Sequence, residues 1–267
     1  FILTICLLIS CGGGKTAVKA SDPARPAAKE LGKGVGWYQK GCYHKSLPHL
    51  LRAHELFTAL DDQPGVAMSM NNIGNVYRET GDSRSAILFF ESAYEIYIDL
   101  ADNRGASQAL SNKAAVLIGD DRLDEAEAVL AAAREITGDA GDRSVSLLNN
   151  QAVLLIRKND YPGAETVLMK ALGASDPQNP AEAAGTNYAL GTLMGKTGRY
   201  DDALEYFHKA LSADRMSGFH SGIADDLAAI GSVYQQMGNH SAAAQYYQRS
   251  VKIYAILENS PKVIEVM

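Results

Sequence analysis

The sequence predicts an all-α fold, a right-handed α-solenoid of about six helix–turn–helix repeats. Three observations predict it. Small residues recur at fixed spacing along nearly the whole chain, larger residues occupy set positions between them, and a turn-forming residue separates the two apolar segments of each unit. A period close to 40 residues indicates a repeat architecture whose units stack to share one continuous core.

The repeat is clearest in three sets of small residues, each with six members. The second member of a unit follows the first by twelve residues and the third follows it by nineteen, while successive units are spaced by 40, 40, 38, 39 and 40 residues. Small side chains let two antiparallel helices approach closely. The first members are Gly34, Gly74, Ala114, Ala152, Gly191 and Gly231; the second are Ser46, Ala86, Ala126, Ala164, Ala203 and Ala243; the third are Ala53, Ala93, Ala133, Ala171, Ala210 and Ser250.

Each unit contains a turn between two helices, A and B. Glycine, asparagine and aspartate tolerate the left-handed backbone that ends a helix, and one of them stands at the same point of every unit. We therefore expect repeats that start near residues 27, 67, 107, 145, 184 and 224. Pro48 lies within the first helix B and predicts a kinked or shortened helix. The turn residues are Gly41, Gly81, Asp121, Asn159, Gly198 and Gly238.

Two segments carry a family resemblance: LGTLMGKTGRYDDALEYFHKAL at 190–211 and IGNVYRETGDSRSAILFFESA at 73–93. Their L-G-x-x-Y…G-x-Y-x-x-A…F…A pattern resembles the tetratricopeptide repeat, and the resemblance extends over residues 27–257. The family unit has 34 residues, whereas these units have 38–40, similar to kinesin-light-chain-like members. We expect the extra residues to lengthen helix B and the connection that follows it.

The amino-terminal segment is predicted to be a targeting signal. Residues 1–10 (FILTICLLIS) are apolar; they are too few to span a bilayer, which takes about 20, but they suit a secretory signal. The Leu-Ile-Ser-Cys stretch that ends at Cys11 resembles the bacterial lipobox. The resemblance implies a lipidated Cys11, a flexible tether over residues 11–26 and attachment in the bacterial cell envelope, at the outer membrane facing the periplasm. Residues 258–267 are either a capping helix or the edge of a longer chain.

Candidate binding residues follow from the resemblance, because helix A lines the concave groove in this family. Asparagine is a poor residue inside a helix, but its amide can bind both C=O and N–H groups of an extended peptide. Asn72, Asn112 and Asn150 occupy equivalent positions and form a predicted ladder. Alternatively, they bond to neighbouring helices or face water. The predicted groove residues are Asn71, Asn72, Asn75, Ser111, Asn112, Asn149, Asn150, Tyr188, Thr192, Asp225 and Ser232.

The sequence offers no recognisable catalytic set: no nucleophile with a base, no metal-ligand cluster and no phosphate loop. The acidic pairs at 120–121, 201–202 and 225–226 are interpreted as helix caps. A net charge of −6 argues against nucleic acid as a partner, because phosphate binding needs a basic face. We therefore expect no enzyme, no cofactor and no metal.

The predicted function is that of a membrane-anchored protein–protein interaction scaffold. It would bind an extracytoplasmic protein or peptide in its groove, for envelope complex, pilus or secretion assembly. The alternative is a small-molecule or substrate-delivery partner of a transporter, which a cavity closed by aromatic residues or a ring of subunits would favour. The partner's identity and the oligomeric state are left open.

Overall fold

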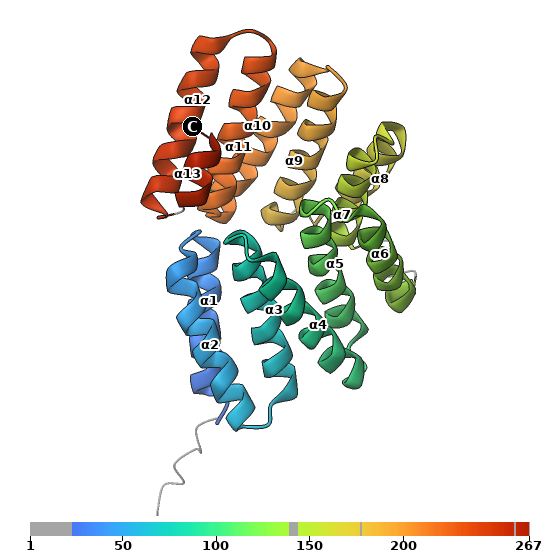
Figure 1. Ribbon diagram of the computed structural model, residues 1–267, viewed down its shortest axis with the longest axis vertical. Helices are drawn as coiled ribbons and strands as arrows, with labels where there is room; N and C mark the ends of the chain where they lie inside the picture. Colours follow the sequence, from blue (N-terminus) through green and yellow to red (C-terminus); the bar gives the residue numbers. More distant parts are fainter. Residues whose placement is uncertain (1–22, 139–143, 177, 259, 267) are drawn as a thin grey trace, which may run out of the picture.

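The computed structural model describes residues 23–138, 144–176, 178–258 and 260–266. Over these residues the chain forms thirteen α-helices and no strand (Figure 1), so the predicted all-α solenoid is confirmed. None of the described helices is long and apolar enough to cross a membrane. The A helices are α1 (Arg25–Gln39), α3 (Gln63–Glu79), α5 (Asn103–Gly119), α7 (Val145–Arg157), α9 (Pro180–Lys196) and α11 (His220–Gln236). The B helices are α2 (Tyr43–Ala59), α4 (Ser83–Asp99), α6 (Leu123–Thr137), α8 (Tyr161–Ala174), α10 (Tyr200–Ser217) and α12 (His240–Ile256), and α13 (Ser260–Val266) follows them.

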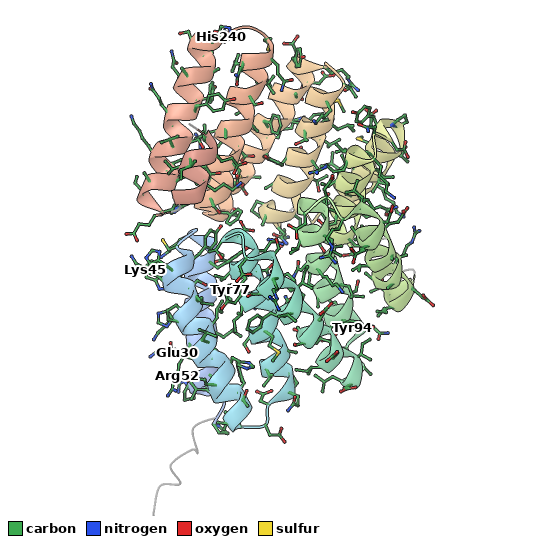
Figure 2. The ribbon with its side chains drawn as sticks, in the orientation of Figure 1. Glu30, Lys45, Arg52, Tyr77, Tyr94 and His240 are labelled. Carbon is green, nitrogen blue, oxygen red and sulfur yellow. The ribbon has the colours of Figure 1, made fainter. Side chains whose placement is uncertain are left out.

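The small residues of the predicted register form the contacts within each helix pair. All eighteen are buried. Figure 2 shows the side chains of the described residues on the helix pairs. A Cβ atom at Gly74 would lie 2.7 Å from Cε1 of Phe90. In the third repeat, Ala114 packs in the same cluster as the smaller Leu130. The close approach of the two helices therefore explains why this position is glycine opposite a phenylalanine ring.

The turns confirm the predicted register and add to it. All six predicted turn residues have positive φ, between 60° and 83°. Asp61 and Ala101 also have positive φ, of 53° and 56°, and they lie in the connections between repeats. Connections within and between the first three repeats thus share one three-residue form. The helices α2 to α6 begin at residues 43, 63, 83, 103 and 123, so the 40-residue unit consists of two 20-residue halves.

Three expectations about helix lengths are corrected by this arrangement. The extra residues lengthen both helices, since α3 and α4 each have 17 residues, and the connection stays short. Helix α2 also has 17 residues although Pro48 lies inside it, so the helix is not shortened, and a kink at Pro48 stays a prediction. Helix α1 begins at Arg25, with Pro26 in the first turn, where a missing N–H costs nothing. Two residues of the predicted tether are therefore helical. Residues 1–22, including Cys11, lie outside the described residues.

The helix pairs curve so that the A helices line the concave side. Successive A helices contact one another directly, and comparable contacts between successive B helices are lacking in the described part of the chain. Elements on the inside of a curved array lie closer together, which places the A helices inside.

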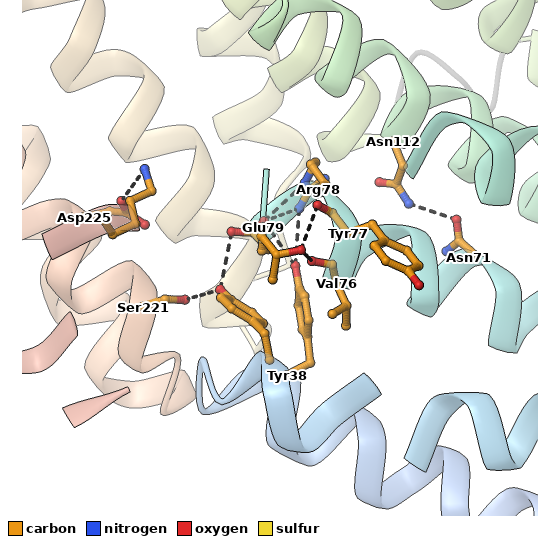
Figure 3. Close-up of polar contacts among 12 residues, drawn as sticks. Tyr38, Asn71, Val76, Tyr77, Arg78, Glu79, Asn112, Ser221 and Asp225 are labelled. Atoms are coloured by element: carbon orange, nitrogen blue, oxygen red, sulfur yellow. Dashed lines mark hydrogen bonds and ion pairs between the residues drawn. The ribbon is translucent and has the colours of Figure 1, made fainter. Parts of the chain in front are cut away.

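The curvature brings the first repeat against the sixth, as the blue and red helices of Figure 1 show. A Cβ atom at Gly41 would lie 2.8 Å from Cδ1 of Leu257. Tyr43 donates a hydrogen bond from its Oη to Oγ of Ser221, at 3.0 Å (Figure 3). We call this contact between the first and sixth repeats the seam.

Candidate functional site

The C-terminal part of the concave face holds a cavity of about 950 Å³ lined by residues of α9 to α13, which we call the groove cavity. Helix α13 contributes Lys262 and Glu265 to its wall. A volume of this size suits an organic ligand or several residues of a peptide. The cavity is also lined by the four groove residues that the sequence predicts in repeats five and six, namely Tyr188, Thr192, Asp225 and Ser232.

Helical spacing explains why these side chains share one face. Tyr188 and Thr192 are four residues apart on α9, which places them one above the other, and Oγ1 of Thr192 donates a hydrogen bond to the backbone oxygen of Tyr188 at 3.0 Å. Gly191, between them, lies against Phe207 of α10. The contact between α9 and α10 at Gly191 thus fixes which side of α9 faces the groove.

Asp225 of α11 contacts both α12 and α13. Its Oδ1 accepts a hydrogen bond from Oη of Tyr254 and lies 3.6 Å from Nζ of Lys262. Burial raises the pKa of the Asp225 carboxyl, while Lys262 and the bond from Tyr254 oppose the rise. The carboxyl therefore joins α11, α12 and α13 at one wall of the groove cavity.

A second cavity, of about 550 Å³, adjoins the first at the seam, and we call it the seam cavity. It shares Tyr188 and Asp225 with the groove cavity. The first repeat contributes Gln39, the last residue of α1. The remaining lining residues come from α9, the end of α10 and α11: Ala181, Ala184, Gly185, Asp214, Ser217, Phe219, Gly222 and Asp226.

The acidic pair at 225–226 does not cap a helix, which corrects the sequence interpretation. Both residues lie inside α11, and Asp226 is only 1% exposed. The pair at 201–202 does lie in the first turn of α10. Several helices are capped instead by an aspartate that directly precedes them, as Asp62 accepts a hydrogen bond from the N–H of Gly65. Composition alone did not distinguish an acidic residue before a helix from one inside it.

In the second to fourth repeats, the predicted asparagines link neighbouring A helices. Nδ2 of Asn112 donates a hydrogen bond to Oδ1 of Asn71, at 3.0 Å (Figure 3), which joins α5 to α3. Nδ2 of Asn150 lies 2.8 Å from the backbone oxygen and 2.9 Å from Oγ of Ser111, which joins α7 to α5. Asn112 is only 8% exposed. These bonds are of the structural kind that the sequence left open, and ligand contact by these residues stays a prediction.

The chain of contacts continues to the fifth repeat through a residue that the sequence analysis missed. Oγ1 of Thr186 on α9 donates a hydrogen bond to Oδ1 of Asn149 at 3.0 Å. We call the bonds from α3 to α9 the amide ladder. Asn72 does not join it, because its Nδ2 bonds to the backbone oxygen of Met68 in its own helix at 2.8 Å. Asn75 is half-buried on α3.

Polar, partly buried residues of the second repeat adjoin the seam. Arg78 forms an ion pair with Glu79 at 2.8 Å, and Oη of Tyr38 lies 3.4 Å from the same Glu79 carboxylate (Figure 3). Burial and the neighbouring Glu79 raise the pKa of the Tyr43 hydroxyl, so it stays protonated and remains a hydrogen-bond donor.

Among the described residues, no group of three or more His, Cys, Asp or Glu side chains is placed to hold a metal ion.

Stacked antiparallel helix pairs with a concave inner face define an α-solenoid repeat protein. The tetratricopeptide repeat family matches residues 36–99 and 182–255. The chain belongs to this family. Comparison with the curated proteins finds no match.

Several solved structures share the fold. One is a Rap protein complexed with the competence and sporulation factor, 14% identical, with a TM-score of 0.66 over 92% of this chain and 73% of that chain. Another is the Rap conjugation gene regulator of plasmid pLS20 in complex with the Phr* peptide, 16% identical, with a TM-score of 0.66 over 87% and 74%. BtubC from P. vanneervenii is 18% identical, with a TM-score of 0.55 over 88% and 91%. At these identities the likeness concerns the fold alone.

Proposed function

We propose that this chain is a membrane-anchored interaction scaffold that binds an extended segment of a partner protein along its concave face. The observation that carries the proposal is the groove cavity of about 950 Å³, which gathers four side chains of the predicted groove. Family membership supports it, because stacked helical repeats present extended concave binding surfaces. Two similar Rap structures contain a factor or a peptide.

The groove cavity has the chemistry that an extended peptide requires. A peptide backbone carries an unpaired N–H and C=O at every residue, and each needs a partner when it leaves water. The Thr192 hydroxyl donates its proton to Tyr188 and offers a peptide its acceptor lone pairs, while the Ser232 hydroxyl offers a donor on the neighbouring helix A. The ring of Tyr188 provides apolar surface. The groove cavity thus offers both main-chain and side-chain contacts.

A substitution in the groove cavity tests whether this surface, rather than the outer face of the solenoid, binds the partner. Thr192→Arg introduces a long charged side chain into the groove cavity, and we expect it to abolish capture of partner proteins from detergent-solubilised bacterial envelopes. Thr166→Arg on the outer face of α8, where Thr166 is exposed, is the matched control and should leave capture unchanged. Equal capture by both variants would rule out the groove as the binding site.

The lipid anchor is the second part of the proposal. A diacylated Cys11 would tether the solenoid to the envelope, at the outer membrane facing the periplasm, because several acyl chains each gain about 0.8 kcal/mol per buried CH₂. Pilus, secretion and envelope-complex assembly are tasks that suit such an anchored scaffold. Metabolic labelling with palmitate should mark the natural protein but not the Cys11→Ser variant. Equal labelling of both would refute the anchor.

Kinship with the kinesin-light-chain-like class also stays a prediction.

The alternative, substrate delivery to a transporter, has one observation in its favour. Phe207, Tyr247 and Tyr254 line the groove cavity, so its wall is partly aromatic. Native mass spectrometry of the protein purified from its own envelope distinguishes the two functions. A bound small molecule of defined mass supports delivery, and a bound peptide or protein supports the scaffold.

A further inference from the structure

The seam cavity contains a buried carboxylate oxygen without a partner in the protein. Asp226 lines this cavity and is 1% exposed, and its Oδ2 is the one buried side-chain oxygen of the described residues that has no hydrogen-bond partner. An unpaired buried polar group costs about 1–3 kcal/mol, and more when it is charged. A native fold retains such a group at this cost only for a reason, and a ligand that donates a hydrogen bond provides one.

The cavity lining around Asp226 contains further carboxyl groups and no basic side chain. Asp214 and Asp225 line the same cavity, and the lining includes no lysine, arginine or histidine. Asp225 has Lys262 beside it, at 3.6 Å. The ion pairs of the described residues provide no basic partner for Asp214 or Asp226, although Asp214 is 6% exposed. Two buried carboxyl groups therefore line a common space, and a cation bound there would compensate the charge that they carry when ionised.

The remaining walls suit an organic cation better than a bare ion. Tyr188 and Phe219 bring two aromatic rings to the lining, and the Phe219 ring is stacked on that of Tyr38 with centroids 6.4 Å apart. Ring faces attract ammonium and guanidinium groups by about 0.5–2 kcal/mol. Ala184 and Gly185 of α9 leave room beside them. The volume of about 550 Å³ accommodates an alkyl chain as well as its charged end.

The position of the seam cavity connects it to the groove. Tyr188 and Asp225 belong to both cavities, so a peptide in the groove cavity passes the mouth of the seam cavity. We propose that the seam cavity binds the guanidinium or ammonium group of a basic side chain, with Asp214 and Asp226 as its carboxylate partners. This inference deepens the proposed function and rests on it for the peptide that carries the side chain.

Proton release is expected to accompany binding. Burial, together with Asp214 and Asp225, raises the pKa of Asp226 to about 9, against an opposing effect of Arg215. Burial also raises the pKa of Asp214 to about 7. A bound cation favours the ionised carboxyls, so affinity should rise from pH 6 to pH 9. The other ionisable groups around this site are Tyr188 on α9, Glu79 on α3, and Lys262 and Glu265 on α13, which act on Asp225 or lie beside it.

The test measures the binding of a small cation and of a peptide library to the same protein. Butylguanidinium chloride is titrated by calorimetry at pH 8, with the neutral butylurea and with calcium chloride as comparison probes. A library of acetylated hexapeptides is then captured and the retained peptides are sequenced. The variants are Asp226→Asn and Asp214→Asn, and the matched control is Glu135→Gln, on the exposed outer face of α6. Circular dichroism establishes that each variant is folded.

We expect butylguanidinium to bind the natural protein and Glu135→Gln equally, and each aspartate variant about tenfold more weakly, a difference of about 1.4 kcal/mol. Retained peptides should be enriched in arginine or lysine, and the enrichment should be lost with Asp226→Asn. The proposal is overturned if butylguanidinium binds no better than butylurea, if Asp226→Asn binds it unchanged, or if calcium alone binds in an Asp226-dependent manner.

The two proposals fail in different ways. Retained peptides without basic enrichment would remove the cation site and leave the peptide groove intact. Binding of butylguanidinium that depends on Asp226, with no retained peptide, would support the cation site for a free amine and remove the peptide groove.

Discussion

The inner face of the solenoid has two regions that treat buried polar groups in opposite ways. Between α3 and α9, the amides of the amide ladder are hydrogen-bonded to polar groups of neighbouring A helices, as Asn112 is bonded to Asn71 at 3.0 Å. At the seam, Asp226 is equally deep but has an oxygen with no partner. Both regions line the same curved surface, and both carry polar residues inside helices.

The difference separates a structural role from a binding role. Paired polar groups recover the hydrogen bonds that they lose to water, so they hold helices in register and need no ligand. An unpaired carboxyl keeps its desolvation cost until something binds it. We therefore expect the amide ladder to serve the fold and the seam cavity to serve recognition, and the predictions below test that division.

The largest expected effect is the change in the free energy of unfolding that Asp226→Asn causes. Burial raises the pKa of Asp226 from its ordinary value of 3.8 to about 9, so the native state binds more protons than the unfolded state across that pH interval. The free energy of unfolding of the natural protein therefore falls as pH rises through the interval. Asp226→Asn removes this loss, and we expect it to stabilise the protein by on the order of 3 kcal/mol at pH 9.

The measurement is chemical denaturation of both proteins at pH 5 and pH 9. At pH 5 the native carboxyl is protonated but the unfolded one is already ionised, because pH 5 lies above 3.8. The difference between the two proteins should therefore be about a quarter of that at pH 9, and Glu135→Gln should be neutral at both values. A variant that is less stable than the natural protein at pH 9 would show that Asp226 is a paired structural carboxylate, and the division of the inner face would collapse.

A smaller effect of opposite sign is expected for Asn112→Ala. The substitution removes the bond to Asn71 and the bond that Gln108 donates to Oδ1 of Asn112 at 3.1 Å. Losing them costs about 1–2 kcal/mol, and the better helix propensity of alanine returns about 0.6 kcal/mol. Urea denaturation should show a net loss of about 1 kcal/mol. A double-mutant cycle with Asn71→Ala should give a coupling of about 0.5 kcal/mol or more, and zero coupling would remove the structural role.

The sequence predicted the architecture because the repeat constrains it many times over. A position that must be small in every unit, such as Gly74 opposite Phe90, is visible in a single sequence once the period is found. The turn at Gly81 follows from the backbone conformation it requires, with φ of 83°. The connection at Ala101 was missed because alanine carries no signal for positive φ, although the fold imposes 56° there.

The candidate site was only partly predictable. Tyr188 and Asp225 were found because their register places them on the groove side of a helix A. Asp214 and Asp226 were missed, because their surroundings depend on the seam, where residues almost 180 positions apart meet. No local pattern encodes that closure, which results from curvature added up over six repeats. The signal that was available was an aspartate inside a helix next to apolar neighbours, as Asp226 is beside Leu227.

The smallest expected effect is that of a substitution at Asn72. Asn72, Asn112 and Asn150 occupy equivalent positions in their repeats, but the structure gives Asn72 a different hydrogen-bond partner. Asn72 bonds to the backbone of Met68 in its own helix, and among the described residues its Nδ2 forms no hydrogen bond to a neighbouring A helix. Such a bond competes with the helix rather than supporting it, while alanine is the better helix former by about 0.6 kcal/mol. Asn72→Ala should therefore leave the free energy of unfolding unchanged or raise it by up to about 0.5 kcal/mol, as measured by the same urea denaturation. A loss as large as that of Asn112→Ala would extend the amide ladder into the second repeat. A neutral Asn72→Ala that also weakens partner capture would instead place its amide among the groove contacts, since a side chain that the fold does not need is free to bind a ligand.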